Sequence, residues 1–253
     1  MKPPSLAAQQ FGATAKSYLE SPVHARGADL DRLRDLAEKA RPASVLDLGC
    51  GAGHASFAIA PSAAKIIAYD VSAPMVAIVA EEAARRGLTS LSAQEGAVEE
   101  LPFEDRRFDW VVTRLSAHHW SDVRKALREA RRVLKDTGTL TIIDVIAPEE
   151  PLFDTILQSV EILRDASHVR NYRVSEWQTL LTTAGFRITE REVWKIPIMF
   201  QSWITRMNTP ESRAVAVRSI FTEAPTEARD YFAVQDDYSF EIDAAWMSAR
   251  PDS

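Results

Sequence analysis

Cysteine is almost absent from this chain of 253 residues, in which Cys50 is the only one. One cysteine cannot form an internal disulfide, which fits a reducing compartment. Long apolar runs are also missing, since none reaches the roughly 18 residues that a membrane helix needs. The N-terminal stretch MKPPSLAAQQ lacks the apolar segment of a secretory signal. We therefore expect a cytoplasmic protein with no membrane partner.

The chain has no excess of positive charge, because 30 Lys and Arg face 36 Asp and Glu, a net charge of -6. Such a balance disfavours a protein whose main partner is a nucleic acid, although it leaves room for a local basic patch. Apolar residues make up 46% of the chain, enough for a full core. The length fits a single domain over 1–253, with an elaborated cap.

Short apolar segments alternate with helical ones along most of the chain. Nearly continuous apolar character, without alternation, is typical of strands buried on both faces of a parallel sheet. The fold class predicted is α/β, with a doubly wound, seven-stranded, mostly parallel sheet and an antiparallel strand pair at its edge. The seven predicted strands are 44–49, 66–70, 91–96, 108–114, 139–146, 186–196 and 238–249.

Helical periodicity fills the intervals between these strands. The helix that ends at Gly185 has Ser175 and Gln178 at the spacing of a capping box. A helical cap is expected over 197–237, between the last two strands, because so long a connection commonly covers a site or a partner surface. The other predicted helices lie within 5–40, 54–60, 73–86 and 121–134.

The segment VLDLGCGAGHAS has glycine at positions 49, 51 and 53, directly after a strand and before a helix. Glycine lets backbone approach a ligand closely, and the helix start offers unpaired N–H groups. The dinucleotide pattern G-x-G-x-x-G/A does not fit, because its third position would be His54 or Ser56. A nicotinamide-dependent oxidoreductase is therefore disfavoured.

Two acids accompany this loop. Asp47 lies inside the strand, where it would repel a pyrophosphate but would attract a cationic amine. Asp70 ends the next strand, 19 residues after Gly51, where a carboxylate can accept both hydroxyls of a ribose. An amine, a ribose and bare backbone between them describe S-adenosylmethionine. The alternatives are a buried structural acid at Asp47 and a helix cap at Asp70.

Four motifs occur in order, namely VLDLGCGAG, AYDVSAPMV, EELPFEDRRFDWVVTRLSAHHW and ALREARRVLKDTGTLTIIDV. Together they resemble the class I S-adenosylmethionine-dependent methyltransferases, and most of all the small-molecule branch related to ubiquinone and menaquinone biosynthesis. The resemblance is strong over 44–147 and loose over 5–40 and 175–196. It implies a Rossmann-like methyltransferase fold, a cofactor-binding core over 41–147, S-adenosylmethionine as cofactor and a small-molecule methyl acceptor.

The resemblance also implies roles for single residues at the methionine and ribose end. Asp47, Gly49 and Gly51 would hold the methionine part, and Asp70 would take the ribose hydroxyls. The carbonyl of Arg114 would lie near the methionine amine.

At the adenine end, Val71 and Met75 would flank the ring, although Met75 could equally be a core residue. Backbone around Ala97 and Val98 would face the edge of the ring. The family commonly has aspartate at the position of Ala97, so this chain must supply that hydrogen bond from backbone, water or elsewhere.

The N-terminal segment FGATAKSYLESPVHARG resembles the family's lid over the site. Tyr18 would cover the methionine end, and His24 would line the same opening. The alternative is a surface helix with a half-buried aromatic side chain.

The histidines of LSAHHW follow the fourth strand, whose end borders the ligand site in a doubly wound sheet. His118 and His119 are therefore the candidate general bases, with no metal site expected. Their alternative roles are caps for the helix 121–134 or packing against Trp120. Such a base contributes about 10²–10⁴-fold where the methyl-accepting atom must lose a proton.

Two further segments suggest the nature of the acceptor. RDASHVRNYR (164–173) contains three arginines that either hold a substrate carboxylate or phosphate or form a solvated basic face. Large apolar side chains in the cap suggest an apolar or aromatic acceptor, unless they pack on one another. A homodimer would be one way to cover the cap. The main alternative function is a non-catalytic S-adenosylmethionine-binding regulatory or scaffold protein.

Overall fold

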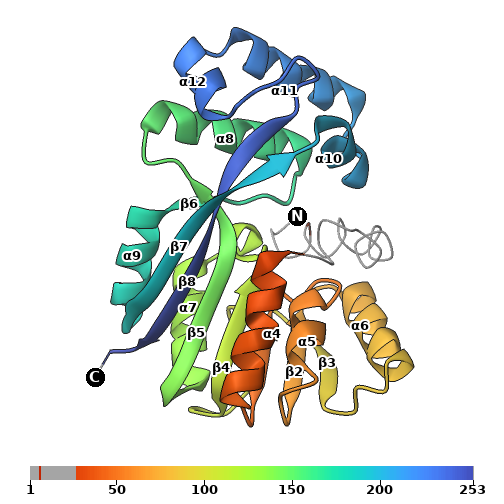
Figure 1. Ribbon diagram of the computed structural model, residues 1–253, viewed down its shortest axis with the longest axis vertical. Coiled ribbons are helices and arrows are strands. Elements are labelled where there is room, and N and C mark those ends of the chain that lie inside the picture. Colours follow the sequence, from red (N-terminus) through yellow and green to blue (C-terminus); the bar gives the residue numbers. More distant parts are fainter. Residues whose placement is uncertain (1–5, 7–26, 253) are drawn as a thin grey trace.

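The computed structural model describes Leu6 and residues 27–252. Its eight-stranded sheet has the order β3-β2-β1-β4-β5-β8-β7, with β6 paired to β5 beside this path (Figure 1). The strands are β1 (Val45–Leu48), β2 (Ile66–Asp70), β3 (Leu91–Glu95), β4 (Phe108–Arg114), β5 (Leu134–Ala147), β6 (Tyr172–Arg173), β7 (Phe186–Ile198) and β8 (Phe240–Pro251).

Strands β1 to β5 pair in parallel, whereas β8 runs antiparallel to both β5 and β7. The prediction of a mostly parallel sheet that ends in an antiparallel pair is confirmed, with β7 at the edge and β8 inside it. All seven predicted strands are present. The eighth, β6, has only two residues and lies in the segment 164–173, which has too few apolar residues to indicate a strand.

Helices cover both faces of the sheet (Figure 1). One face packs against α4, α5 and α6, through side chains that include Leu33, Phe57 and Val79. The other face packs against α7 and α9, through Leu127 and Trp177 among others. Fully burying each such apolar side chain contributes about 1.5–3 kcal/mol. These helices are α4 (Ala28–Ala40), α5 (His54–Ile59), α6 (Ala73–Arg85), α7 (Val123–Val133) and α9 (Val174–Thr183).

The helical cap predicted between the last two strands is present, beyond the carboxyl ends of the parallel strands (Figure 1). Strands β7 and β8 extend past the sheet and carry the cap, where α8 joins it and a third apolar cluster forms. The cap helices are α8 (Pro151–Arg164), α10 (Phe200–Arg206), α11 (Glu211–Glu223) and α12 (Thr226–Tyr231).

The start of α9 differs from the predicted capping box. The helix begins two residues earlier, with Arg173 instead of Ser175 as its N-cap, and the Glu176 carboxylate accepts the backbone N–H of Arg173 at 2.9 Å. The N–H and hydroxyl of Ser175 donate instead to Glu149, at 2.9 and 2.6 Å. The spacing of Ser175 and Gln178 predicted the wrong helix start, because the charged Glu176 side chain competes better than Gln178 for the N–H groups there.

Of the predicted N-terminal helical region 5–40, the structure describes Leu6 and α4. Leu30, Leu33 and Ala37 of α4 are buried against the sheet, so this helix is part of the core. The segment with Tyr18 and His24 lies outside the described residues. Among the helices that the structure describes, none has both the length and the hydropathy required to cross a bilayer.

Candidate active site

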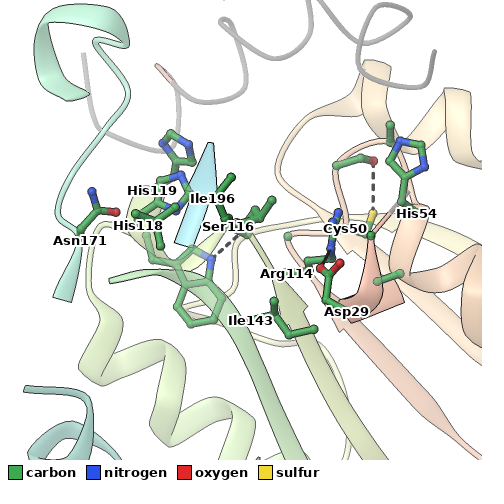
Figure 2. Close-up of a pocket in the computed structure, with 18 of the residues that line it drawn as sticks. Asp29, Cys50, His54, Arg114, Ser116, His118, His119, Ile143, Asn171 and Ile196 are labelled. Carbon is green, nitrogen blue, oxygen red and sulfur yellow. Dashed lines mark hydrogen bonds and ion pairs between the residues drawn. The ribbon is translucent and has the colours of Figure 1, made fainter. Parts of the chain in front are cut away.

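A cavity of about 680 Å³ lies between the cap and the carboxyl ends of the parallel strands. Its lining includes residues at or just after the ends of β1, β2 and β4, together with residues of β5, β7, β8, α8 and α10. In Figure 2, Cys50 and His54 lie on one side, His118, His119 and Asn171 on the other, and Arg114 with Asp29 between them. Among the described residues, all the predicted cofactor and base residues line this cavity, namely Asp47, Gly49, Gly51, Asp70, Val71, Met75, Ala97, Val98, Arg114, His118 and His119.

The glycine loop adopts backbone conformations that other residues rarely take. Gly49 and Gly51 have φ angles of 64° and 51°. A Cβ at Gly49 would lie 1.8 Å from Ser116 Oγ, whereas a Cβ at Gly51 would meet nothing within 4 Å. Glycine at 49 therefore lets the loop pack on the segment after β4, and glycine at 51 leaves bare backbone facing the cavity.

Asp47 is buried in β1 with one carboxylate oxygen paired and one not. Its Oδ2 accepts the hydroxyl of Ser56 at 2.6 Å and the N–H of the same residue at 3.1 Å. Its Oδ1 has no hydrogen-bond partner among the described residues. Burial raises the pKa of Asp47 to about 6, against the hydrogen bonds from Ser56. An unpaired buried carboxylate oxygen fits a ligand with an ammonium group.

Asp70, at the end of β2, holds the glycine loop. Its Oδ2 accepts the N–H of Gly51 at 2.8 Å, and its Oδ1 accepts the N–H of Ser72 at 2.9 Å. Burial raises its pKa, although these N–H groups favour the charged form. A carboxylate has about four acceptor positions, so its bonds to the loop leave acceptor capacity for a sugar hydroxyl.

Apolar side chains line the neighbouring part of the cavity. Met75 and Val98 are buried, and Val71 and Ala97 are partly exposed beside them. The side chain of Ala97 offers no hydrogen bond at the position where the family commonly has aspartate. Glu99 also lines the cavity, but its Oε1 already accepts the N–H and hydroxyl of Ser121, at 2.9 and 2.7 Å.

Arg114 and Asp29 form an ion pair with 2.5 Å between Nε and Oδ2, and their side chains are only 8% and 12% exposed. The pair links the end of β4 to the first turn of α4. The guanidinium also favours the charged form of Asp47, as the last of the influences on its pKa. The resemblance implied a role for the backbone carbonyl of Arg114. In the structure the residue lines the cavity, and its side chain forms the ion pair with Asp29.

His118 pairs with a buried carboxylate that the sequence reasoning missed. Its Nδ1 lies 2.6 Å from Oδ1 of Asp144 in β5, and its backbone N–H donates to Asp144 Oδ2 at 3.3 Å. Burial opposes a charged imidazole, but the charge and hydrogen bond of Asp144 outweigh it and raise the pKa of His118. Because Nδ1 donates to the carboxylate, Nε2 is the ring nitrogen left for the cavity.

His119 is in a different environment. Its Nδ1 lies 3.1 Å from the carbonyl of Ser167, and its Nε2 lies 3.9 Å from Asp165 Oδ2. Burial, followed by the nearby charge of His118, lowers the pKa of His119 to about 4. With Nδ1 donating to a backbone carbonyl, the ring is oriented by the loop after α8.

A third histidine, His168, completes a cluster in which its ring centroid lies 5.8 Å from that of His118 and 6.4 Å from that of His119. Its Nε2 lies 3.0 Å from Gln158 Oε1, and burial lowers its pKa to about 2. Within the described part of the chain, no three His, Cys, Asp or Glu residues are arranged to hold a metal ion.

The three arginines of 164–173 are paired with protein groups. Arg170 binds Asp154 and Glu176, and Arg173 binds Glu176 as well. Arg164 lines the cavity, but its Nε donates to the Trp203 carbonyl at 3.1 Å. The arginines of this segment therefore form a network of bonds with other protein groups. This network differs from both predictions, the substrate-anion site and the solvated basic face.

The large side chains of the cap mostly pack on one another. Phe200, Trp203, Phe221 and Phe232 are buried in one cluster, with 4.9 Å between the ring centroids of Phe221 and Phe240. Of these four, only Trp203 also lines the cavity.

One missed site residue, Asp144, could have been found in the sequence with the signal that identified Asp47. Asp144 is an acid inside the apolar run TLTIIDVI, just as Asp47 is in SVLDLG. An acid in a buried strand needs a partner, so it marks a site in either strand. Asn171 carried no comparable signal, because it lies in a polar loop.

Comparison with known proteins identifies the family of this chain. The chain is 44% identical to the uncharacterised Escherichia coli protein YafE over 202 residues, which are 80% of this chain and 98% of YafE. It is 38% identical to the uncharacterised methyltransferase YcgJ of Bacillus subtilis over 224 residues, 88% of each chain. Residues 46–142 match the methyltransferase domain family.

Two solved structures are similar to this chain over most of its length. The crystal structure of YcgJ has a TM-score of 0.81 at 34% identity and covers 88% of this chain and 99% of its own. That of the Bacillus halodurans protein BH2331 has a TM-score of 0.85 at 32% identity, over 90% and 100%. The chain therefore belongs to the S-adenosylmethionine-dependent methyltransferases, as its motifs predicted.

Proposed function

We propose that this enzyme transfers the methyl group of S-adenosylmethionine to a hydroxyl oxygen of a small molecule, with His118 as general base. The observation that carries the proposal is the 2.6 Å contact of His118 Nδ1 with buried Asp144, at a cavity that also contains Asp47 and Asp70. A histidine oriented by a carboxylate is suited to removing a proton from a weakly acidic group.

The residues around the glycine loop fit the cofactor. Asp47 Oδ1 is available for the methionine ammonium group, and Asp70 has acceptor capacity left for a ribose hydroxyl. The bare backbone at Gly51 permits close approach, and Val71, Met75 and Val98 offer an apolar surface for adenine. Backbone at Ala97 would face the adenine edge.

When bound, the cofactor supplies an electrophilic methyl group on a sulfonium, which keeps the electron pair of the broken carbon–sulfur bond and leaves as a thioether. The chain's own residues act on the acceptor. His118 Nε2 takes the hydroxyl proton as the new carbon–oxygen bond forms, and Asp144 stabilises the resulting imidazolium.

Alignment and proton removal together supply the catalysis. Holding the acceptor oxygen against the methyl group contributes up to about 7–11 kcal/mol of the barrier reduction. The base adds about 10²–10⁴-fold in rate. The partly buried cavity, closed on one side by the cap, limits water around the dyad and strengthens its electrostatic interactions.

The proposal is tested with radiolabelled S-adenosylmethionine and a deproteinised metabolite extract. The wild type should transfer label to a small molecule, and His118→Ala should lower the rate at least tenfold while binding S-adenosylhomocysteine with unchanged affinity. Binding of the cofactor without transfer to any metabolite would instead favour the non-catalytic regulatory or scaffold function.

A further inference from the structure

The side-chain amide of Asn171 is buried at the cavity and has no hydrogen-bond partner within the part of the chain that the structure describes. The residue is 1% exposed and lines the cavity. Among the described residues, neither its Oδ1 nor its Nδ2 has a hydrogen-bond partner. A buried amide that has lost water and gained no partner is unfavourable for folding, so it indicates a place where a ligand completes the bonds.

The backbone of Asn171 is fully paired, in contrast to its side chain. Gln158 Oε1 accepts the Asn171 N–H at 3.1 Å, and Gln158 Nε2 donates to the Asn171 carbonyl at 2.7 Å. His168 Nε2 binds the same Gln158 Oε1 at 3.0 Å. The loop is therefore fixed by Gln158 and does not require the Asn171 amide.

The same loop is attached to the candidate base. The N–H groups of Val169 and Arg170 donate to the His118 carbonyl, at 2.9 and 3.1 Å. Figure 2 shows Asn171 beside His118 and His119 at one side of the cavity. A group held by the Asn171 amide would therefore lie near the imidazole.

The charges at this side of the cavity are largely compensated. Arg164 lies 3.9 Å from Glu161, and its guanidinium stacks 4.9 Å from the Trp203 ring centroid. Lys195 is paired with Asp243 at 3.2 Å. Each of these two cations therefore already has an acidic partner in the protein. The surrounding walls are apolar, through Leu115, Val145, Ile198, Trp203 and Ile242.

An amide has its acceptor and its donor on the same carbon, so both bond best to groups on adjacent atoms of a ligand. We propose that Asn171 selects the acceptor, and that this acceptor is a neutral ring compound with oxygen functions on two adjacent carbons. One oxygen accepts from Asn171 Nδ2 and gives its proton to His118 Nε2. The second is a hydroxyl that donates to Asn171 Oδ1. The inference rests on the proposed function for the role of His118.

The test uses catechol and resorcinol, which differ only in the spacing of their two hydroxyls, in calorimetric titrations of the complex with S-adenosylhomocysteine. The wild type should bind catechol at least tenfold more tightly than resorcinol. Asn171→Leu should remove this preference, with a melting temperature unchanged or raised, because an unpaired polar group has been removed.

Thr113→Val is the matched control, because Thr113 Oγ1 is also buried and unpartnered but lies outside the cavity lining. This variant should keep the catechol preference. Equal binding of the two diols, no binding of either at millimolar concentration, or a preference that survives Asn171→Leu would overturn the inference. Catechol preference without methyl transfer to any hydroxyl compound would leave the Asn171 site intact and reject the proposed function instead.

Discussion

His118 Nδ1 and Asp144 Oδ1 lie 2.6 Å apart, although 26 positions separate the two residues in the chain. The contact forms because β4 and β5 pair in parallel, so the segment after β4 passes the last residues of β5. The carboxylate orients the imidazole and supports its positive charge.

Asp144→Asn should lower turnover about 10²-fold while leaving cofactor affinity unchanged, because the imidazole loses its orientation and its counter-charge. Asp144 raises the pKa of His118, so the variant should have a lower one. A base acts when neutral, so activity rises with pH through its pKa. The acidic limb of kcat/KM against pH should therefore shift to lower pH in the variant, and an unmoved limb would argue against His118 as the base.

His119→Asn should keep turnover within about tenfold of the wild type, in contrast to His118→Ala. Its pKa of about 4 leaves it neutral throughout the physiological range, and its Nδ1 is held by the Ser167 carbonyl. Parallel initial-rate measurements on both variants check this difference. A larger loss at His119 than at His118 would reverse the assignment of roles.

Gly51→Ala should weaken binding of S-adenosylhomocysteine at least tenfold, because its Cβ would occupy space that the cofactor needs. Gly87→Ala is the control, since Gly87 has a similar positive φ of 68° and equally open surroundings outside the site. Both variants should lose about 1 kcal/mol of stability from the backbone strain. Calorimetry that finds the same affinity in both variants would show that no ligand approaches Gly51.

Asp47→Asn should weaken cofactor binding about 10- to 100-fold, because a hydrogen bond between charged groups contributes about 1.5–3 kcal/mol. Wild-type affinity should also fall as pH drops below about 6, the pKa of Asp47, since only the carboxylate attracts an ammonium. Calorimetric titrations from neutral to acidic pH check both expectations. Affinity that is flat through this range would contradict a role for Asp47 in binding the amine.

The same substitution should stabilise the free protein, and the sign follows from the pKa. The native pKa of about 6 lies above the usual 3.8, so the native state binds the proton more tightly than the unfolded chain does. The free energy of unfolding therefore decreases as pH rises between these values and stays reduced above them. Thermal melts should show a larger gain for Asp47→Asn at neutral pH than near pH 4. An equal gain at both would mean that the pKa of Asp47 is not raised in the native state.

Most of the fold could be predicted from local signals. Continuous apolar runs marked β1, β2, β4 and β5, because a strand covered on both faces needs apolar side chains at every position. The glycine spacing and the acid in β1 predicted the cofactor side of the cavity. Bare backbone and a buried charge are both unfavourable without a ligand, so they indicate a binding site. The short β6 and the start of α9 were missed, because they depend on pairing with β5 and on Glu176.

By itself, the sequence determined the order of the seven long strands along the chain, the glycine loop, the acids at 47 and 70 and the pair of histidines after β4. Each of these depends on residues close together in the chain. Only the tertiary structure decided that His118 pairs with Asp144, that Arg114 pairs with Asp29, and that the amide of Asn171 has no partner among the described residues. These relationships join residues from different strands, helices and loops. Their geometry follows from how the cap, the sheet and the loop after α8 pack together, and spacing along the chain does not encode that packing.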